Sequence, residues 1–320
     1  MFLNKIKFNY NIKLIDDYFL EKKYDEIYKH LVSLKKQPDL FFKLLSYVSD
    51  KYLSHPIHHP FYKNKIVWVI SYDLDDTNYV NKFLNFYFLE NQKLEIIHDS
   101  FSKAFSDAIE ELKIKDFPSE LSFDDMVNKS HLYQNLVLLK NDKNIFLSTC
   151  AAFFEARNNR FYIYPQNTLA YILILRNPFQ IYTKYKKENN SSQEALNFLN
   201  GYKENDLNKK NLFKYNLLEN KESWNINSKS WLDENVLNTY RGKIFQYDDF
   251  YNNTEETLVE ILFHLKQSGL DFEIDYDLIS RFIENNIMEK SELIEVSKNE
   301  EKILKSHLDQ NLINDYKFSL

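Results

Sequence analysis

A chain of 320 residues, of which 44% are hydrophobic, has the length and apolar content for one large α/β domain or two smaller ones. Its net charge of −6 and isoelectric point near 5.8 argue against a general nucleic-acid or membrane-surface binder. Cys150 is the only cysteine, which excludes an intrachain disulfide, and no run of residues is typical of a transmembrane helix or a signal peptide. We therefore expect a cytoplasmic protein that binds no nucleic acid and does not insert into a membrane.

The N-terminal residues have a helical pattern. Over 14–54 apolar residues recur at helical spacing, as at Leu40, Leu44 and Val48, and a break near 37–39 divides the pattern into two predicted helices. The prolines of 54–60 then predict a loop. We expect a helical N-terminal extension over 1–60, followed by an α/β domain over 61–320.

Short apolar runs alternate with helical patterns in the rest of the chain. Strands are predicted over 66–71, 94–98, 145–149, 170–175 and 243–247. Helices are predicted over 79–89, 99–113, 254–266 and 277–284. Because parallel strands are joined by crossover helices, this alternation predicts a three-layer α/β fold, with a mainly parallel sheet flanked by helices.

One predicted strand stops at an arginine. The apolar run 171–175 ends in Arg176-Asn177-Pro178, and a helical pattern follows. Open α/β sheets bind ligands at the carboxyl ends of their strands, and the planar fork of arginine suits a phosphate group there. The chain has five arginines against 36 lysines, so composition alone explains an arginine at this position less readily than it would a lysine.

Glycine is scarce in this sequence. The three glycines are Gly201, Gly242 and Gly269, and none lies in the first 200 residues. Glycine lets a backbone approach a phosphate closely and adopt positive φ angles. The first 200 residues therefore cannot contain a regular glycine-rich phosphate loop.

Four segments in chain order resemble the signature of the sulfotransferase family. The strand 66–71 with the helix after it resembles the family's first strand and phosphate-loop region, and Arg176-Asn177-Pro178 matches its R-[DN]-P motif. The other matching parts are the strand end Ser148-Thr149-Cys150, where the family has Lys-Thr-His; Ile181 and Tyr185; the strand end 246–250 with its following helix; and the tryptophans Trp224 and Trp231. The resemblance covers roughly residues 62–290.

The resemblance implies a P-loop-like sulfotransferase fold. It also implies transfer of a sulfuryl group from 3′-phosphoadenosine 5′-phosphosulfate to a hydroxyl of a glycan, a lipid or a small molecule. Such transfer depends on positioning and electrostatic stabilisation, and the family uses the histidine of Lys-Thr-His as its base. The positions that correspond to the donor site are Arg176, Lys184, Thr77 and Asn78, and the base position is Cys150. We therefore expect Arg176 to lie at a strand end that faces the turn 73–78.

The sequence departs from the family pattern at the positions of the chemistry. The proline, basic residue, serine and glycine of the phosphate loop are replaced by Asp73, Leu74, Asp75 and Asp76. Carboxylates thus stand where a dianion binds, and like charges at roughly 4 Å repel by about 4 kcal/mol at a protein-surface dielectric. We expect sulfuryl transfer to be weak or absent, and a non-catalytic binding protein of the same fold is the alternative.

The acidic segment allows another interpretation. Asp73 and Asp75 after an apolar strand match the D-x-D-x-T motif of haloacid dehalogenase-like phosphatases, in which the first aspartate is the nucleophile and Mg²⁺ bridges it to phosphate. Ser148 or Thr149, Lys184 and the pair Asp248-Asp249 would then supply the later motifs. The plainer interpretation is a solvated acidic loop in which Asp75 or Thr77 caps the next helix.

The remaining candidate groups favour structural roles. His55, His58 and His59, with His98 or His131, lack a regular ligand spacing, so we expect loop histidines and no metal site. Without an identifiable histidine partner, Cys150 is predicted to be a buried strand-end residue rather than a nucleophile.

Overall fold

The computed structural model describes most of the chain. The described residues are 2–34, 37–48, 51, 64–90, 99–100, 104, six positions within 130–138, 143–153, 155–156, 160–161, 163–201, 222–288 and 296–318.

Within the described residues, five parallel strands form one sheet in the order β2-β3-β1-β6-β7. They are β1 (Ile66–Ser71), β2 (Asp99–Ser100), β3 (Ile145–Thr149), β6 (Thr168–Leu175) and β7 (Gly242–Gln246). A separate antiparallel pair joins β4 (Glu155–Ala156) to β5 (Arg160–Phe161). The parallel α/β fold is confirmed, and the strands predicted at 66–71, 145–149, 170–175 and 243–247 are each present to within two residues.

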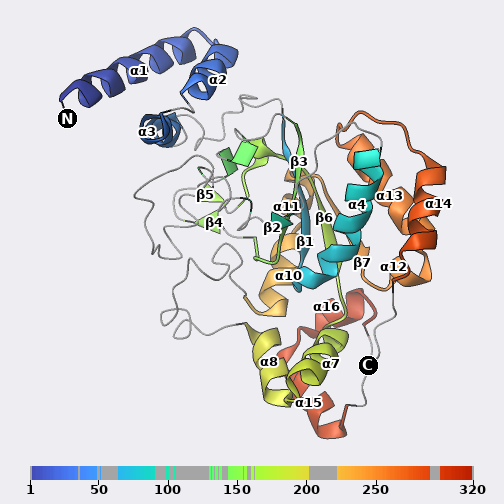
Figure 1. The fold of residues 1–320 in the computed structure, drawn as a ribbon. Coiled ribbons are helices and arrows are strands. Elements are labelled where there is room, and N and C mark those ends of the chain that lie inside the picture. Colours follow the sequence, from blue (N-terminus) through green and yellow to red (C-terminus); the bar gives the residue numbers. More distant parts are fainter. Residues whose placement is uncertain are drawn as a thin grey trace.

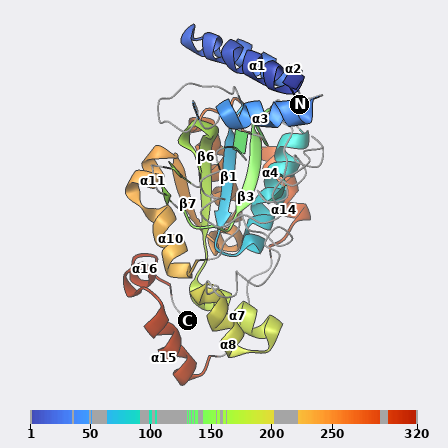
Figure 2. The ribbon, with the colours of Figure 1, turned by 90° about the vertical axis from the view of Figure 1, so that its left-hand side faces the viewer.

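Helices cover both faces of the sheet (Figures 1 and 2). Val67 and Val69 of β1 point to one face, where they share a buried cluster with α4 (Asn78–Glu90), α13 (Thr254–Gln267) and α14 (Tyr276–Asn285). Trp68 points to the other face and packs in a cluster with α10 (Trp224–Leu232) and α11 (Glu234–Thr239). Every β1 residue is buried, as expected for a strand covered on both faces.

A further group of helices lies beyond the carboxyl ends of the strands (Figure 2). It comprises α7 (Pro178–Asn189), α8 (Ser192–Asn200), α15 (Lys298–His307) and α16 (Gln310–Asp315), which share one buried cluster. Short helical turns are η2 (Leu74–Thr77), η3 (Pro165–Asn167) and α12 (Asp249–Asn252). The group matters for function because α7 follows directly on β6 and Arg176.

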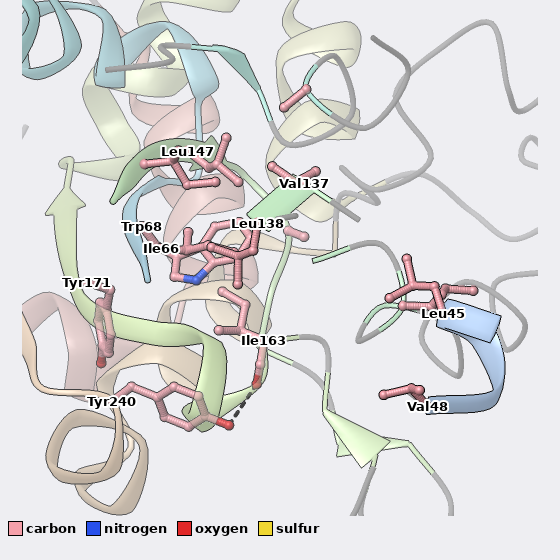
Figure 3. Close-up of a cluster of buried hydrophobic side chains, with 14 of the residues drawn as sticks. Leu45, Val48, Ile66, Trp68, Val137, Leu138, Leu147, Ile163, Tyr171 and Tyr240 are labelled. Atoms are coloured by element: carbon pink, nitrogen blue, oxygen red, sulfur yellow. Dashed lines mark hydrogen bonds between the residues drawn. The ribbon is translucent and has the colours of Figure 1, made fainter. Parts of the chain in front are cut away.

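The N-terminal helices lie near the opposite end of the sheet (Figure 2). They are α1 (Phe2–Leu20), α2 (Tyr24–Ser33) and α3 (Pro38–Val48), so the predicted break near 37–39 is confirmed, whereas the prediction of two helices from residue 14 was wrong. Leu45 and Val48 belong to the same buried cluster as the sheet residues Ile66 and Trp68 (Figure 3). No helix in the described ranges is both long and apolar enough to cross a membrane.

One predicted helix begins as a strand. Asp99–Ser100 is β2 and pairs with Leu147 and Ser148 of β3, so the helix predicted over 99–113 was wrong at its start, although Ala104 is helical. The hydrogen bonds of a two-residue edge strand come from its neighbour, and local residue pattern does not encode them. The strand predicted over 94–98 lies outside the described residues.

The two central strands lead to opposite faces of the sheet. From β1 the chain turns into α4 on one face, whereas from β6 it passes through α7 and α8 to α10 and α11 on the other. The loops that follow neighbouring strands therefore diverge at the carboxyl ends of β1 and β6. Such a topological switch point is where open α/β sheets place a ligand crevice.

Glu300 of α15 fastens the C-terminal helices to α7 and α8. Its carboxylate accepts hydrogen bonds from Tyr182 (2.9 Å), Lys186 (2.8 Å) and Ser192 (2.6 Å). It also accepts from the backbone and hydroxyl of Ser297, which closes a capping box at the start of α15. The bond from Lys186 is foremost among the contacts that hold the pKa of Glu300 well below its ordinary value.

We predict that Gly242→Ala destabilises the sheet. A Cβ at Gly242 would overlap the ring of its neighbour Tyr171, whose hydroxyl donates to the Trp231 carbonyl at 2.7 Å. Overpacking of this kind costs about 1–3 kcal/mol, which chemical denaturation measures. Adding Tyr171→Leu should make room for the new methyl group, so the double variant should lose less than the sum of the single losses. Additive losses would show that the two side chains do not clash.

We predict that Glu300→Gln lowers the melting temperature at pH 7 by about 2–4 °C. Because the folded state holds the pKa of Glu300 below its ordinary 4.5, its contribution is present above that pH and is lost as the pH falls below it. The gap between variant and wild type should therefore close on acidification. Glu301→Gln is the control, since Glu301 makes an exposed contact with Lys305. Equal losses in both variants would contradict this role of Glu300.

Candidate functional site

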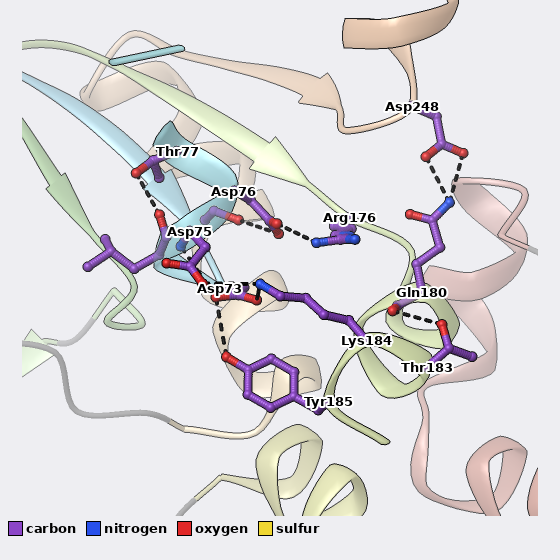
Figure 4. A network of polar contacts seen from close by, with 12 residues as sticks. Asp73, Asp75, Asp76, Thr77, Arg176, Gln180, Thr183, Lys184, Tyr185 and Asp248 are labelled. Atoms are coloured by element: carbon purple, nitrogen blue, oxygen red, sulfur yellow. Dashed lines mark hydrogen bonds and ion pairs between the residues drawn. The ribbon is translucent and has the colours of Figure 1, made fainter. Parts of the chain in front are cut away.

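The candidate site lies at the carboxyl ends of β1 and β6, where the sequence placed Arg176 opposite the turn 73–78. Figure 4 shows Arg176, Lys184 and the three aspartates of that turn directed toward one another. The prediction that Arg176 stands at a strand end facing this turn is confirmed, because its guanidinium contacts Asp76.

The turn after β1 is a tight helical turn rather than a phosphate loop. Asp73 caps η2, and its side chain accepts a hydrogen bond from the Asp75 backbone at 3.3 Å. The Thr77 hydroxyl donates to the Leu74 carbonyl at 2.7 Å. Asp73, rather than Asp75 or Thr77, is thus the residue that caps η2, and its carboxylate occupies the Asp75 N–H, a donor that a bound anion would otherwise contact.

Arg176 and Asp76 form a buried ion pair. The Arg176 nitrogen Nη1 lies 2.5 Å from Asp76 Oδ1, and the side chains are 5% and 2% exposed. The Tyr247 ring lies against the guanidinium, with its centroid 4.2 Å from Arg176 Cζ. Ser71 donates a long hydrogen bond to the other Asp76 oxygen at 3.4 Å. A carboxylate of the protein therefore pairs with Arg176, the side chain that we expected to bind a phosphate.

Lys184 also pairs with carboxylates of the turn after β1. Its ammonium group reaches from α7 to Asp73 at 2.7 Å and to Asp75 at 3.2 Å. The Tyr185 hydroxyl also donates to Asp73, at 3.4 Å. Asp73 is buried, whereas the Asp75 side chain is 70% exposed. The predicted solvated acidic loop is therefore correct for Asp75 and wrong for Asp73 and Asp76, because α7 and β6 supply cations that pair with the buried carboxylates.

The cluster has an excess of negative charge. Asp73, Asp75 and Asp76 face Arg176 and Lys184, so three carboxylates share two cations. Burial raises the pKa of Asp76 to about 7; Arg176 opposes this rise, and the neighbouring Asp73 adds to it. Burial alone would lower the pKa of Arg176 and of Lys184, but the adjacent carboxylates raise both above their ordinary values.

The other predicted donor-site residues lie on the β3 side of the turn. Thr77 is buried and accepts a hydrogen bond at 3.1 Å from Asn81 Nδ2, which also donates to Ser148 at 2.7 Å. Asn78 is the exposed first residue of α4. Asn81 of α4 therefore links Thr77 of η2 to Ser148 of β3, a connection that the sequence patterns did not reveal.

Cys150 is buried at the end of β3, as predicted for a strand-end cysteine. The segment after it is tied to α10, because Asn227 donates to the Cys150 carbonyl at 2.8 Å and Trp231 donates to the Ala151 carbonyl at 2.9 Å. Ser230 in turn accepts from the Phe153 backbone at 2.9 Å. The tryptophan segment noticed in the sequence thus covers the position that would correspond to the catalytic base.

The aspartates that the phosphatase interpretation would group around a metal ion contact different side chains instead. Asp73 and Asp75 bind Lys184, whereas Asp248 accepts two contacts from Gln180 of α7, at 2.9 and 3.2 Å. In the part of the chain that the structure describes, no three His, Cys, Asp or Glu side chains are grouped to hold a metal ion. His55, His58, His59, His98 and His131 lie outside the described residues.

Sequence reasoning missed Gln180 as a member of the site, and it included Tyr185 and Tyr247 only as parts of matching motifs, without a role in the site. Gln180 and Tyr185 both lie on α7, and a helical wheel places Gln180, four residues before Lys184, on the same face as that lysine. Tyr247 belongs to the matching strand end 246–250, but its contact with Arg176 arises from the pairing of β6 with β7, which the motif did not predict.

Comparison with protein-family models and with curated proteins finds no match to this chain.

We predict strong coupling between Arg176 and Asp76. At pH 8 Arg176→Met should destabilise the fold by about 3–5 kcal/mol, because it leaves a buried carboxylate without its partner. The loss should be smaller at pH 5.5, where Asp76 takes up a proton, and smaller in the double variant Arg176→Met, Asp76→Asn. Denaturant unfolding of the four proteins measures the cycle. Additive losses at both pH values would show that the pair does not act as a unit.

Proposed function

We propose that this chain is a sulfotransferase-like binding protein that does not transfer sulfuryl groups at neutral pH, because its own carboxylates occupy the cations of the donor site. The observation that carries the proposal is the buried contact between Arg176 and Asp76. The parallel sheet and the switch point at β1 and β6 support the scaffold. The ligand class proposed for the acceptor side is a hydroxyl compound, such as a glycan, a lipid or a small molecule.

Electrostatics argue against binding of 3′-phosphoadenosine 5′-phosphosulfate to the site as it stands. The phosphates of that donor would approach Asp73 and Asp76, which are held in place by Lys184 and Arg176. Each like-charge contact at roughly 4 Å opposes binding by about 4 kcal/mol at an effective dielectric of about 20. The residues present therefore do not fit the donor at neutral pH.

The groups needed for the reaction are also missing. A transferred sulfuryl group needs donors preorganised toward the developing charge, and loss of one such donor typically costs about 3–4 kcal/mol, or 10²- to 10³-fold in rate. Here the loop lysine is Leu74, the loop glycine is Asp76, and the base position is the buried Cys150. Binding without transfer is the function that these residues support best.

We predict that adenosine 3′,5′-bisphosphate does not bind the wild-type chain measurably in calorimetry at pH 8, whereas Asp76→Asn binds it. Because about a tenth of wild-type molecules carry a proton on Asp76 at pH 8, removing its charge should raise affinity about tenfold. Asp75→Asn is the matched control, because the exposed Asp75 is screened by solvent and its removal should change affinity by only about threefold. Micromolar binding by the wild-type chain, with turnover of the sulfated donor, would overturn the proposal.

A further inference from the structure

The carboxyl group of Asp76 can be ionised or protonated, and the two forms give the site different binding properties. We propose that Asp76 is a proton-operated gate: when it takes up a proton, Arg176 and Lys184 become a binding site for a tetrahedral oxyanion of the sulfate or phosphate class. The inference rests on the proposed function, since it gives the condition under which the self-occupied site opens.

The groups around Asp76 make its charge decisive for whether the cluster can bind an anion. Among the described residues, the charged and titratable groups around it are Asp73 and Asp75 from its own turn, Arg176 after β6, Lys184 and Tyr185 from α7, and Tyr247 after β7. With all carboxylates ionised, three negative groups face two cations. One proton on Asp76 leaves two carboxylates for two cations and removes the strongest competitor for Arg176.

Protonation also changes what Asp76 can bind. An ionised carboxylate only accepts hydrogen bonds, so it repels an oxyanion and holds the Arg176 guanidinium for itself. A protonated carboxyl has an O–H that donates to an oxyanion oxygen, alongside the N–H groups of Arg176. The same side chain thus turns from a competitor of the anion into one of its ligands, without a change in fold.

Lys184 and Asp75 are the more exposed members of the cluster, so an anion would contact them before it reached Arg176. The Lys184 side chain is 21% exposed and that of Asp75 is 70% exposed, whereas Arg176 and Asp76 lie beneath them. An oxyanion would meet the ammonium of Lys184 first and then displace the neutral Asp76 carboxyl from the guanidinium.

We expect anion binding to change near neutral pH, where Asp76 gains or loses its proton. Burial is the main cause that raises the pKa of Asp76, to about 7. A group with that pKa carries its proton in about a tenth of molecules at pH 8 and in nearly all at pH 5.5, so the apparent affinity for the anion should rise about tenfold between the two.

Inorganic sulfate is the suitable probe, because it keeps its double negative charge over this pH range while phosphate does not. We predict that titration calorimetry of the wild-type chain, at constant ionic strength in chloride, gives about tenfold tighter sulfate binding at pH 5.5 than at pH 8. Asp76→Asn, whose amide imitates the neutral carboxyl, should bind equally well at both. Asp75→Asn should keep the tenfold ratio, and Arg176→Met should bind no sulfate at pH 5.5.

The outcomes separate the gate from the proposed function. If Asp76→Asn binds sulfate at both pH values and the wild-type chain binds it at neither, the gate is refuted while the self-occupied site stands. Equal, tight binding by the wild-type chain at both values refutes both. If histidines elsewhere cause the pH dependence, Asp76→Asn will show the tenfold ratio too, which also refutes the gate.

A second measurement needs no variant. Carboxyl ¹³C NMR of selectively labelled aspartate in the wild-type chain should show one group titrating near neutral pH, and sulfate should shift that titration to higher pH, because the anion binds the protonated form. A titration that sulfate leaves unchanged overturns the proposal.

Discussion

The site depends on one buried ion pair between two loops that the sheet topology brings together. Arg176 ends β6, Asp76 lies in the turn after β1, and both side chains are almost wholly enclosed. A buried charge is tolerated in a protein interior when a partner of opposite sign meets it with good hydrogen-bond geometry. The pair therefore constrains the β1 turn, the direction in which α7 leaves the sheet, and what else can bind there.

The surrounding contacts extend the same arrangement. Lys184 from α7 takes Asp73 and Asp75, so the helix after β6 is held to the turn after β1. Glu300 holds the other side of α7 through Tyr182 and Lys186. A phosphate site on this scaffold would need cationic side chains that are not already paired with carboxylates of the protein. In this chain Arg176 and Lys184 are instead paired with aspartates of the protein itself.

The sequence allowed the sheet and the meeting of Arg176 with the β1 turn to be predicted, for a physical reason. Buried parallel strands are continuous apolar runs, and parallel strands that neighbour one another end at the same edge, so residues just beyond them converge. The absence of glycine likewise predicted that the turn would not be a phosphate loop, and η2 has formed there instead.

The partners within the site could not be predicted. Asp76 and Arg176 are separated by 100 residues, and nothing local to 73–77 distinguishes a buried aspartate from the exposed Asp75. The contact of Gln180 with Asp248 and the packing of Tyr247 on Arg176 arise in the same way, from the pairing of β6 with β7. Contacts between residues far apart in the sequence therefore determine which of these aspartates is buried and which is exposed.

The most direct measurement is a crystal structure of the Asp76→Asn variant grown in sulfate. Our account predicts a sulfate ion between the Arg176 guanidinium and the Lys184 ammonium, with the turn 73–77 otherwise retained. A structure in which the substituted amide side chain still fills that position, with no anion bound and Arg176 turned to another partner, would contradict the claim that Asp76 occupies an oxyanion site.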